Sequence, residues 1–136
     1  LAFWAIAAVN LDGVLSLFIA LWVGVVGAFL YFNIWPARIQ LGNTGGLAFG
    51  ATLAVIGLLS GKILALLVIA GLFVVDGGSS LIQILSKKLR NGKRVFPIAP
   101  LHHWLEIIGW EEPKIVARAW LAGIVLAIFG LWLAFL

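Results

Sequence analysis

Long apolar stretches dominate the pattern of hydrophobic and polar positions along the chain. A helix that crosses the hydrocarbon core needs about 20 mostly apolar residues, because its backbone must satisfy its own hydrogen bonds there. Three stretches have this length: 14–32 has no charge, 63–85 contains only Asp76, and 115–136 contains only Arg118 near its start. A fourth stretch, 44–59, is shorter. The pattern predicts about four spanning helices.

Two shorter features complete this pattern. Gly45, Gly46, Gly50 and Gly57 punctuate the stretch 44–59, and small residues of this kind predict close packing against neighbouring helices. Residues 1–9 are apolar but too short to cross a bilayer, so we expect them to be one end of a further helix. A chain that begins at Leu1 and contains no Met is expected to be part of a longer protein.

The composition supports an all-α fold: a polytopic transmembrane helix bundle forming a single domain over residues 1–136. Hydrophobic residues make up 64% of the chain and charged residues 10%, and the mean hydropathy is +1.19. The net charge of +4 is concentrated in one stretch, which argues against a nucleic acid polymer as partner. The absence of cysteine excludes disulfide scaffolds and thiolate chemistry.

The basic stretch also predicts the orientation. Short loops rich in Lys and Arg stay on the cytoplasmic side of the membrane. The basic residues are Lys87, Lys88, Arg90, Lys93 and Arg94. They place the segment 86–113 in the cytoplasm, and counting helices backwards places the loop 35–43 on the same side.

Two adjacent histidines are the first candidates for chemistry. His102 and His103 follow Pro97 and Pro100 and precede Glu106 in the cytoplasmic loop. Imidazoles can donate hydrogen bonds to an anion and exchange protons near neutral pH, which favours a phosphate or metal-phosphate contact. The alternative is an interfacial loop anchored by the neighbouring tryptophans.

A glycine-rich turn is the second candidate. The sequence Gly42-Asn43-Thr44-Gly45-Gly46 leads directly into a predicted helix, whose free N–H groups and dipole favour an anion. Ordinary helix capping is the alternative interpretation.

A polar stripe within an apolar stretch is the third candidate. Asp76 is costly at membrane depth, so we expect it to face other helices and to have a partner. Ser79, Ser80 and Gln83 continue the stripe towards the loop. Contact with substrate and simple helix packing are both open. Lys114 and Arg118, at the start of the last helix, can reach lipid phosphates.

These residues form an ordered pattern that resembles the C-terminal part of phospho-N-acetylmuramoyl-pentapeptide transferases, within the polyprenyl-phosphate N-acetylhexosamine-phosphate transferase superfamily. The matching segments are Phe32-Asn33, Pro36-Ala37, Gly42-Asn43-Thr44-Gly45-Gly46-Leu47-Ala48-Phe49-Gly50, Phe73-Val74-Val75-Asp76, Ser79, Gln83, Gly92-Lys93-Arg94-Val95-Phe96, Ala99-Pro100-Leu101-His102-His103, Glu106, Gly109-Trp110, Glu112-Pro113-Lys114 and Arg118.

The resemblance implies a multi-pass enzyme of the bacterial inner membrane with a cytoplasmic active face. Such an enzyme transfers phospho-N-acetylmuramoyl-pentapeptide from UDP-N-acetylmuramoyl-pentapeptide to undecaprenyl phosphate, releasing UMP and forming lipid I for peptidoglycan. The resemblance also implies Mg²⁺ as cofactor, contact with membrane lipid and a homodimer.

By the same resemblance, His102, His103 and Asn43 contact the donor phosphates or metal. Asn33 and Gln83 contact the nucleotide, Arg118 the lipid phosphate, and Asp76 the substrate.

The chain departs from the family pattern at several positions. Asn43 replaces a metal-binding aspartate, Gln40 replaces an aromatic residue that stacks on uracil, and Trp104 follows two histidines where the family has three. The family's paired aspartates have no counterpart, and the turn around Asp12 is a shortened form of a family loop. The alternative hypothesis is therefore a truncated or degenerate, non-catalytic membrane scaffold of the same fold.

Overall fold

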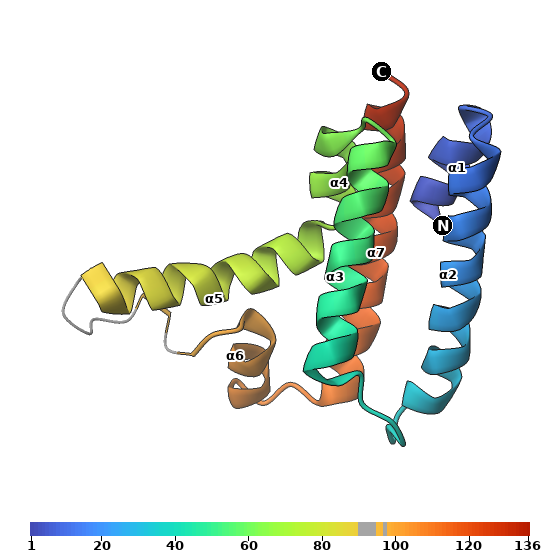
Figure 1. The fold of residues 1–136 in the computed structure, drawn as a ribbon. Coiled ribbons are helices and arrows are strands. Elements are labelled where there is room, and N and C mark those ends of the chain that lie inside the picture. The colour runs from blue at the N-terminus through green and yellow to red at the C-terminus, as the bar shows by residue number, and fades with distance from the viewer. Residues whose placement is uncertain (90–94, 97) are drawn as a thin grey trace. The chain divides into compact units, whose positions relative to one another are not determined.

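Helices are the only regular secondary structure in the part of the chain that the structure describes. The computed structural model describes residues 1–89, 95–96 and 98–136, and contains no strand in those ranges. Figure 1 shows the helices in order along the chain. Their bounds are α1 (Ala2–Val9), α2 (Gly13–Asn33), α3 (Gly42–Leu59), α4 (Ile63–Ile69), α5 (Gly71–Leu89), α6 (Leu101–Ile107) and α7 (Glu112–Ala134). The predicted all-α fold is confirmed.

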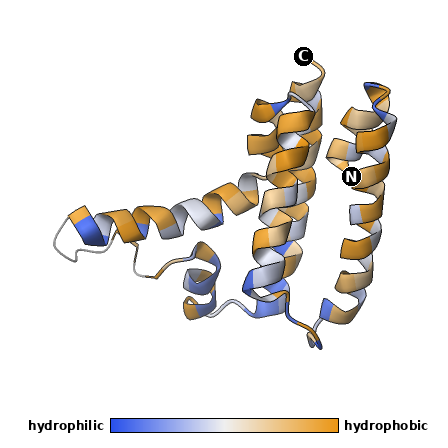
Figure 2. Cartoon of the chain, viewed as in Figure 1, coloured by the Kyte–Doolittle hydropathy of each residue, from blue (hydrophilic) through white to orange (hydrophobic). Residues whose placement is uncertain are grey.

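Three of the predicted spans form single long helices. By length and composition α2, α3 and α7 could each cross a membrane, and α4 with α5 could supply a fourth span. Figure 2 shows mostly hydrophobic residues along α2 and α7, with polar residues gathered on α6, the start of α7 and the end of α5. The chain is a membrane protein with three to four candidate spans. Helix α7 begins at Glu112 and Pro113, as expected for an N-terminal turn.

The predicted helix over 63–85 is not continuous, which corrects the sequence prediction. It is broken at Ala70 into α4 and α5, which are bent by 81°. Helix α4 extends only about 10 Å, too short to cross the hydrocarbon core alone. Gly71 begins α5, and a Cβ added there would lie 3.1 Å from a methyl group of Leu126 in α7. The lack of a side chain at Gly71 therefore allows a close approach directly after the break.

The chain forms two compact units, residues 1–66 with 128–136, and residues 67–127. In the first unit α1 folds back onto α2, and Phe3, Ile6 and Ile19 are buried between them and their neighbours. Asp12 caps the start of α2: its carboxylate accepts a hydrogen bond of 3.0 Å from the N–H of Leu15.

Close helix packing at the glycines of α3 is confirmed at one position. A Cβ added to Gly57 would collide with the side chain of Leu66 in α4. A Cβ added to Gly46 or Gly50 would have no neighbour within 4 Å. A Cβ added to Gly45 would approach only the side chain of Leu41, the residue that precedes α3. The lack of a side chain at Gly57 therefore lets α3 and α4 approach each other, whereas Gly46 and Gly50 face open space within the described chain.

The second unit contains α5, α6 and most of α7. Helix α6 lies beside α5 and leads through a short turn into α7 (Figure 1). Ser79, Gln83 and Ser86 form a buried polar face of α5, whereas Leu81 and Ile84 on other faces are exposed. Of the predicted polar stripe, Ser79 and Gln83 lie on this face, whereas Asp76 and Ser80 are partly exposed.

Candidate active site

His102 and Asp76 form the centre of the candidate site. The Nδ1 atom of His102 lies 2.9 and 3.0 Å from the two carboxylate oxygens of Asp76. The backbone N–H of His102 also donates to Asp76, at 3.3 Å, in the first turn of α6. Both side chains are partly exposed. Asp76 thus has the partner that the sequence required, on an element 26 residues away.

His103 has a carboxylate partner of its own. Its Nδ1 atom lies 2.9 Å from Oε2 of Glu106, one turn later on α6. The centroids of the His102 and His103 rings are 4.3 Å apart. Glu106 was not among the residues predicted to form the site. The i, i+3 spacing between His103 and Glu106 on a helix was the signal that could have identified it.

The two carboxylates determine which imidazole nitrogen is available. An ionised carboxylate only accepts hydrogen bonds, so each Nδ1 must carry the proton and donate it. Each Nε2 is the nitrogen that the carboxylates leave unbound, and it can accept a proton or, when protonated, donate to an anion. The pair can therefore bind a phosphate group and transfer protons to or from it.

Gln83 holds the segment before α6 in place. Its Oε1 atom accepts hydrogen bonds from the N–H groups of Val95 and Phe96, at 3.1 and 3.0 Å, and its Nε2 atom donates to the carbonyl of Phe96 at 2.8 Å. The side chain is buried. Both ends of its amide thus bind the backbone of the loop, an arrangement that sequence spacing could not reveal.

Arg118 and Lys114 approach one aromatic ring. The guanidinium carbon of Arg118 lies 4.2 Å from the centroid of the Trp110 ring, and Nζ of Lys114 lies 5.2 Å from it. Both cations are exposed at the start of α7. Their position fits contact with an anion arriving from the membrane surface.

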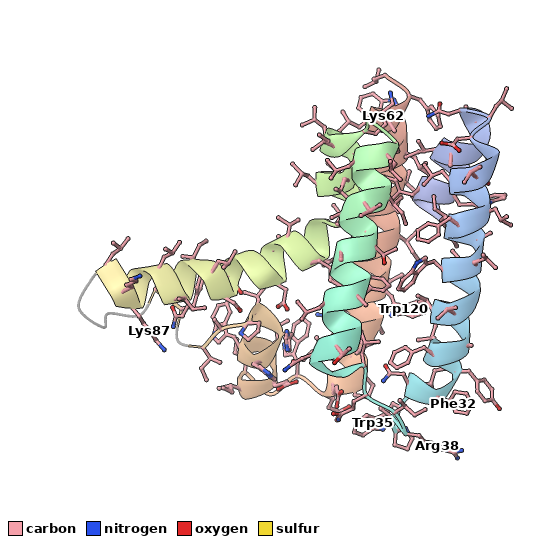
Figure 3. All side chains as sticks on the ribbon, in the orientation of Figure 1. Phe32, Trp35, Arg38, Lys62, Lys87 and Trp120 are labelled. Atoms are coloured by element: carbon pink, nitrogen blue, oxygen red, sulfur yellow. The ribbon has the colours of Figure 1, made fainter. Side chains whose placement is uncertain are left out.

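The second unit contains an apolar pocket of about 680 Å³. Leu72, Phe73 and Trp120 contribute to its apolar walls, and Trp120 is labelled on α7 in Figure 3. Asp76, His102 and Arg118 also line it. A pocket with apolar walls and a few polar groups is typical of sites for amphipathic ligands.

Asn33 and Asn43 belong to the first unit. The side chain of Asn33 donates a hydrogen bond of 2.6 Å to the carbonyl of Ile39, across the loop after α2. Figure 3 shows Phe32, Trp35 and Arg38 at this loop. Asn43 is exposed in the first turn of α3, which has no side-chain cap. The predicted proximity of Asn43 to the histidines stays a prediction.

The described residues do not by themselves fit a magnesium site. They contain no cluster of three or more His, Cys, Asp or Glu side chains suited to a metal. Asn43 is neutral, and Asp12, the one acidic side chain in its unit, caps α2. Magnesium prefers charged oxygen ligands together with water or substrate phosphates. Arg90, Lys93 and Arg94 of the predicted basic loop lie outside the described residues.

Comparison with known proteins supports the resemblance. No protein-family model matches the chain. A phospho-N-acetylmuramoyl-pentapeptide-transferase from Solibacter usitatus is 45% identical over 117 residues, covering 86% of this chain and 31% of that protein. Proteins of the same name from Desulfatibacillum aliphaticivorans and Orientia tsutsugamushi are 40% and 44% identical, covering 88% and 80% of this chain and 33% and 30% of their own lengths.

The extent of these matches defines the relationship. The chain spans about a third of the length of each of these relatives. The similarity covers at least 80% of the chain in each case. As the sequence resemblance predicted, this chain is a relative of the phospho-N-acetylmuramoyl-pentapeptide-transferases and matches their C-terminal part.

Proposed function

We propose that this chain supplies part of the active site of a phospho-sugar transferase that forms lipid I. The donor is UDP-N-acetylmuramoyl-pentapeptide and the acceptor is undecaprenyl phosphate. The observation that carries the proposal is the pair of imidazoles, each held through Nδ1 by a carboxylate, one of them at an apolar pocket that Arg118 also lines. The names and identities of the relatives support the same assignment.

The reaction needs charge stabilisation around two phosphate groups. An oxygen of the acceptor phosphate attacks the sugar-linked phosphorus of the donor, the bond from that phosphorus to the bridging oxygen breaks, and UMP leaves with that oxygen. Catalysis of such transfers consists mainly of positioning and electrostatic stabilisation. Protonated Nε2 atoms of His102 and His103 would donate to the diphosphate oxygens, where negative charge develops.

Other residues would position the substrates. Arg118 would bind the phosphate of the acceptor lipid, and the apolar walls of the pocket suit an adjoining hydrocarbon chain. Asn33 and Asn43 would contact the donor at its nucleotide and phosphate ends. The hydrogen bonds of Gln83 to the loop favour a role in holding His102 near Asp76 over direct nucleotide contact.

The setting of the site belongs to the same proposal. We place it on the cytoplasmic face of the bacterial inner membrane, in a protein that forms homodimers. Dependence on Mg²⁺ is proposed from the resemblance alone, with the donor diphosphate and residues beyond the described chain as ligands. We assign no reaction step to that ion, because Asn43 supplies no charge for it.

The proposal is tested by UMP release in lipid nanodiscs containing the chain, both substrates and magnesium. We expect turnover to fall at least about 100-fold in the His102→Gln and His103→Gln variants, because loss of a hydrogen-bond donor aimed at developing charge costs about that much. Asn43→Asp should raise turnover by restoring a charged ligand. Absence of UMP release from both the chain and its Asn43→Asp variant would count against catalysis by this chain and favour the scaffold described next.

A second candidate function is a non-catalytic membrane scaffold. The observation that favours it is the coverage: the chain spans about a third of its relatives, and Asn43 stands where the family has a carboxylate. A scaffold would keep the α5–α6–α7 unit folded and bind lipid phosphate without releasing UMP. Measuring acceptor binding and turnover on the same sample separates the two functions.

A further inference from the structure

Trp110 occupies a fixed position between α6 and α7. Gly109, with φ of +96°, ends α6 in a Schellman motif: its N–H donates to the carbonyl of Glu106 at 2.9 Å, and the N–H of Trp110 donates to Leu105 at 3.1 Å. Trp110 and Leu105 also line the same pocket. The backbone of Trp110 is therefore anchored to the helix that carries His102.

Two cations converge on the ring of this residue. Lys114 and Arg118 are four residues apart, on one side of α7, at 5.2 and 4.2 Å from the ring centroid. No carboxylate lies within ion-pair distance of either cation in the part of the chain that the structure describes.

We propose that Trp110 is a positioning residue for a two-cation site that binds a phosphate-bearing group at the pocket. This inference rests on the proposed function, in which Arg118 binds the phosphate of the acceptor lipid. The indole face attracts both cations, and so holds two long, exposed side chains together against their mutual repulsion. An anion between them relieves that repulsion. The ligand is a phosphate group, either as a monoester on a lipid or as free phosphate.

The same residue links this site to the histidines. The Schellman motif connects Trp110 to the end of α6, and Asp76 binds His102 at the start of that helix. The phosphate held by Lys114 and Arg118 is thereby kept in register with the imidazoles. Trp110 itself needs no contact with the ligand.

Titration of the chain in nanodiscs with dodecyl phosphate, followed by the ³¹P signal, tests the inference. Trp110→Leu keeps an apolar side chain but removes the aromatic face, and Trp110→Phe keeps a weaker aromatic face. We expect the affinity to fall about two- to five-fold in Trp110→Leu, with Trp110→Phe between it and the parent chain. Trp132→Leu, an exposed tryptophan near the other end of α7, is the matched control and should bind as the parent does.

The other outcomes are equally decisive. Three results would overturn the positioning role. The affinity for dodecyl phosphate could fall equally in Trp110→Leu and Trp110→Phe, it could fall in Trp132→Leu, or it could stay at the parent value in Trp110→Leu. Inorganic phosphate with the same dependence on Trp110 would identify a free phosphate as the ligand. Binding of dodecyl phosphate alone would identify a lipid.

The Arg118→Gln variant separates failure of the proposed function from failure of the positioning role. Full affinity in Arg118→Gln would remove the lipid-phosphate role on which this inference rests, whatever Trp110 does. Loss of affinity in Arg118→Gln without any effect of Trp110 would leave that role intact and overturn only the positioning. UMP release is not needed for either reading.

Discussion

Asp76 performs two tasks with one carboxylate. It accepts hydrogen bonds from the imidazole and from the backbone N–H of His102, and so fixes both the ring and the start of α6. A carboxylate near a helix N-terminus is favoured by the helix dipole as well. The ring orientation therefore depends on the charge and the acceptor-only character of this side chain.

Replacing Asp76 by Asn should change the tautomer of His102. An amide can present an N–H to Nδ1, which moves the imidazole proton to Nε2, so that Nε2 can no longer accept a proton from a ligand. Imidazole ¹⁵N shifts measure this directly, because the chain has two histidines and His103 serves as an internal reference. Asp76→Glu should retain the parent pattern. Unchanged His102 shifts in Asp76→Asn would contradict the assignment.

Gln83 should contribute to stability through the loop. Gln83→Leu leaves three backbone groups of Val95 and Phe96 without their partner, at a cost of about 1–3 kcal/mol. Thermal unfolding followed by circular dichroism should show a lower midpoint. Gln40→Leu, at the other and exposed glutamine, should change stability by less than about 0.5 kcal/mol. Equal midpoints for both variants would show that the loop contacts contribute nothing.

Sequence reasoning located the polar residues of the site but not their partners. The cost of a carboxylate in an apolar stretch identified Asp76, and helical spacing placed Gln83 on its side of the helix. The pairing of Asp76 with His102 depends on a chain reversal that no local periodicity encodes. The contact of Arg118 with Trp110 could not be predicted either, because the sequence offered Trp104 and Trp110 alike as membrane anchors.

At the scale of elements, hydrophobic length predicted α2, α3 and α7 within a few residues. The prediction of one helix over 63–85 was wrong, because an apolar run indicates burial or lipid contact but does not indicate whether the helix is straight. The break at Ala70 coincides with tertiary contacts: Gly71 approaches α7, and the polar face of α5 packs within its unit. No proline marks the site, and Gly71 is only a weak local signal, because isolated glycines are tolerated within helices.

The glycines of α3 provide a test of helix packing. Gly57→Leu should overpack the contact with Leu66 and destabilise the chain by about 1–3 kcal/mol, whereas Gly50→Leu adds a side chain in open space. Thermal unfolding in the same detergent compares the two variants. A midpoint for Gly57→Leu equal to that of Gly50→Leu would mean that α3 and α4 do not pack at this glycine.

At the scale of the whole molecule, the candidate site residues fall into two groups. Asp76, Gln83, His102, His103 and Arg118 lie in the unit 67–127, whereas Asn33 and Asn43 lie in the unit that contains α2 and α3. Lys and Arg counts predict that both groups face the cytoplasm. The transferase account requires this, because one diphosphate must reach Asn43 and the imidazoles together.

The separation of these two groups in a bilayer is the most direct test. The chain has no cysteine, so Thr44→Cys and Ile107→Cys introduce unique positions for spin labels beside Asn43 and at the end of α6. Chains that carry only one label are the control, because any distance they give must arise between two copies of the chain. Pulsed electron resonance in nanodiscs should give a main distance well below the about 30 Å thickness of the hydrocarbon core. A main distance at or above that thickness would place the two groups on opposite sides of the membrane and contradict the account.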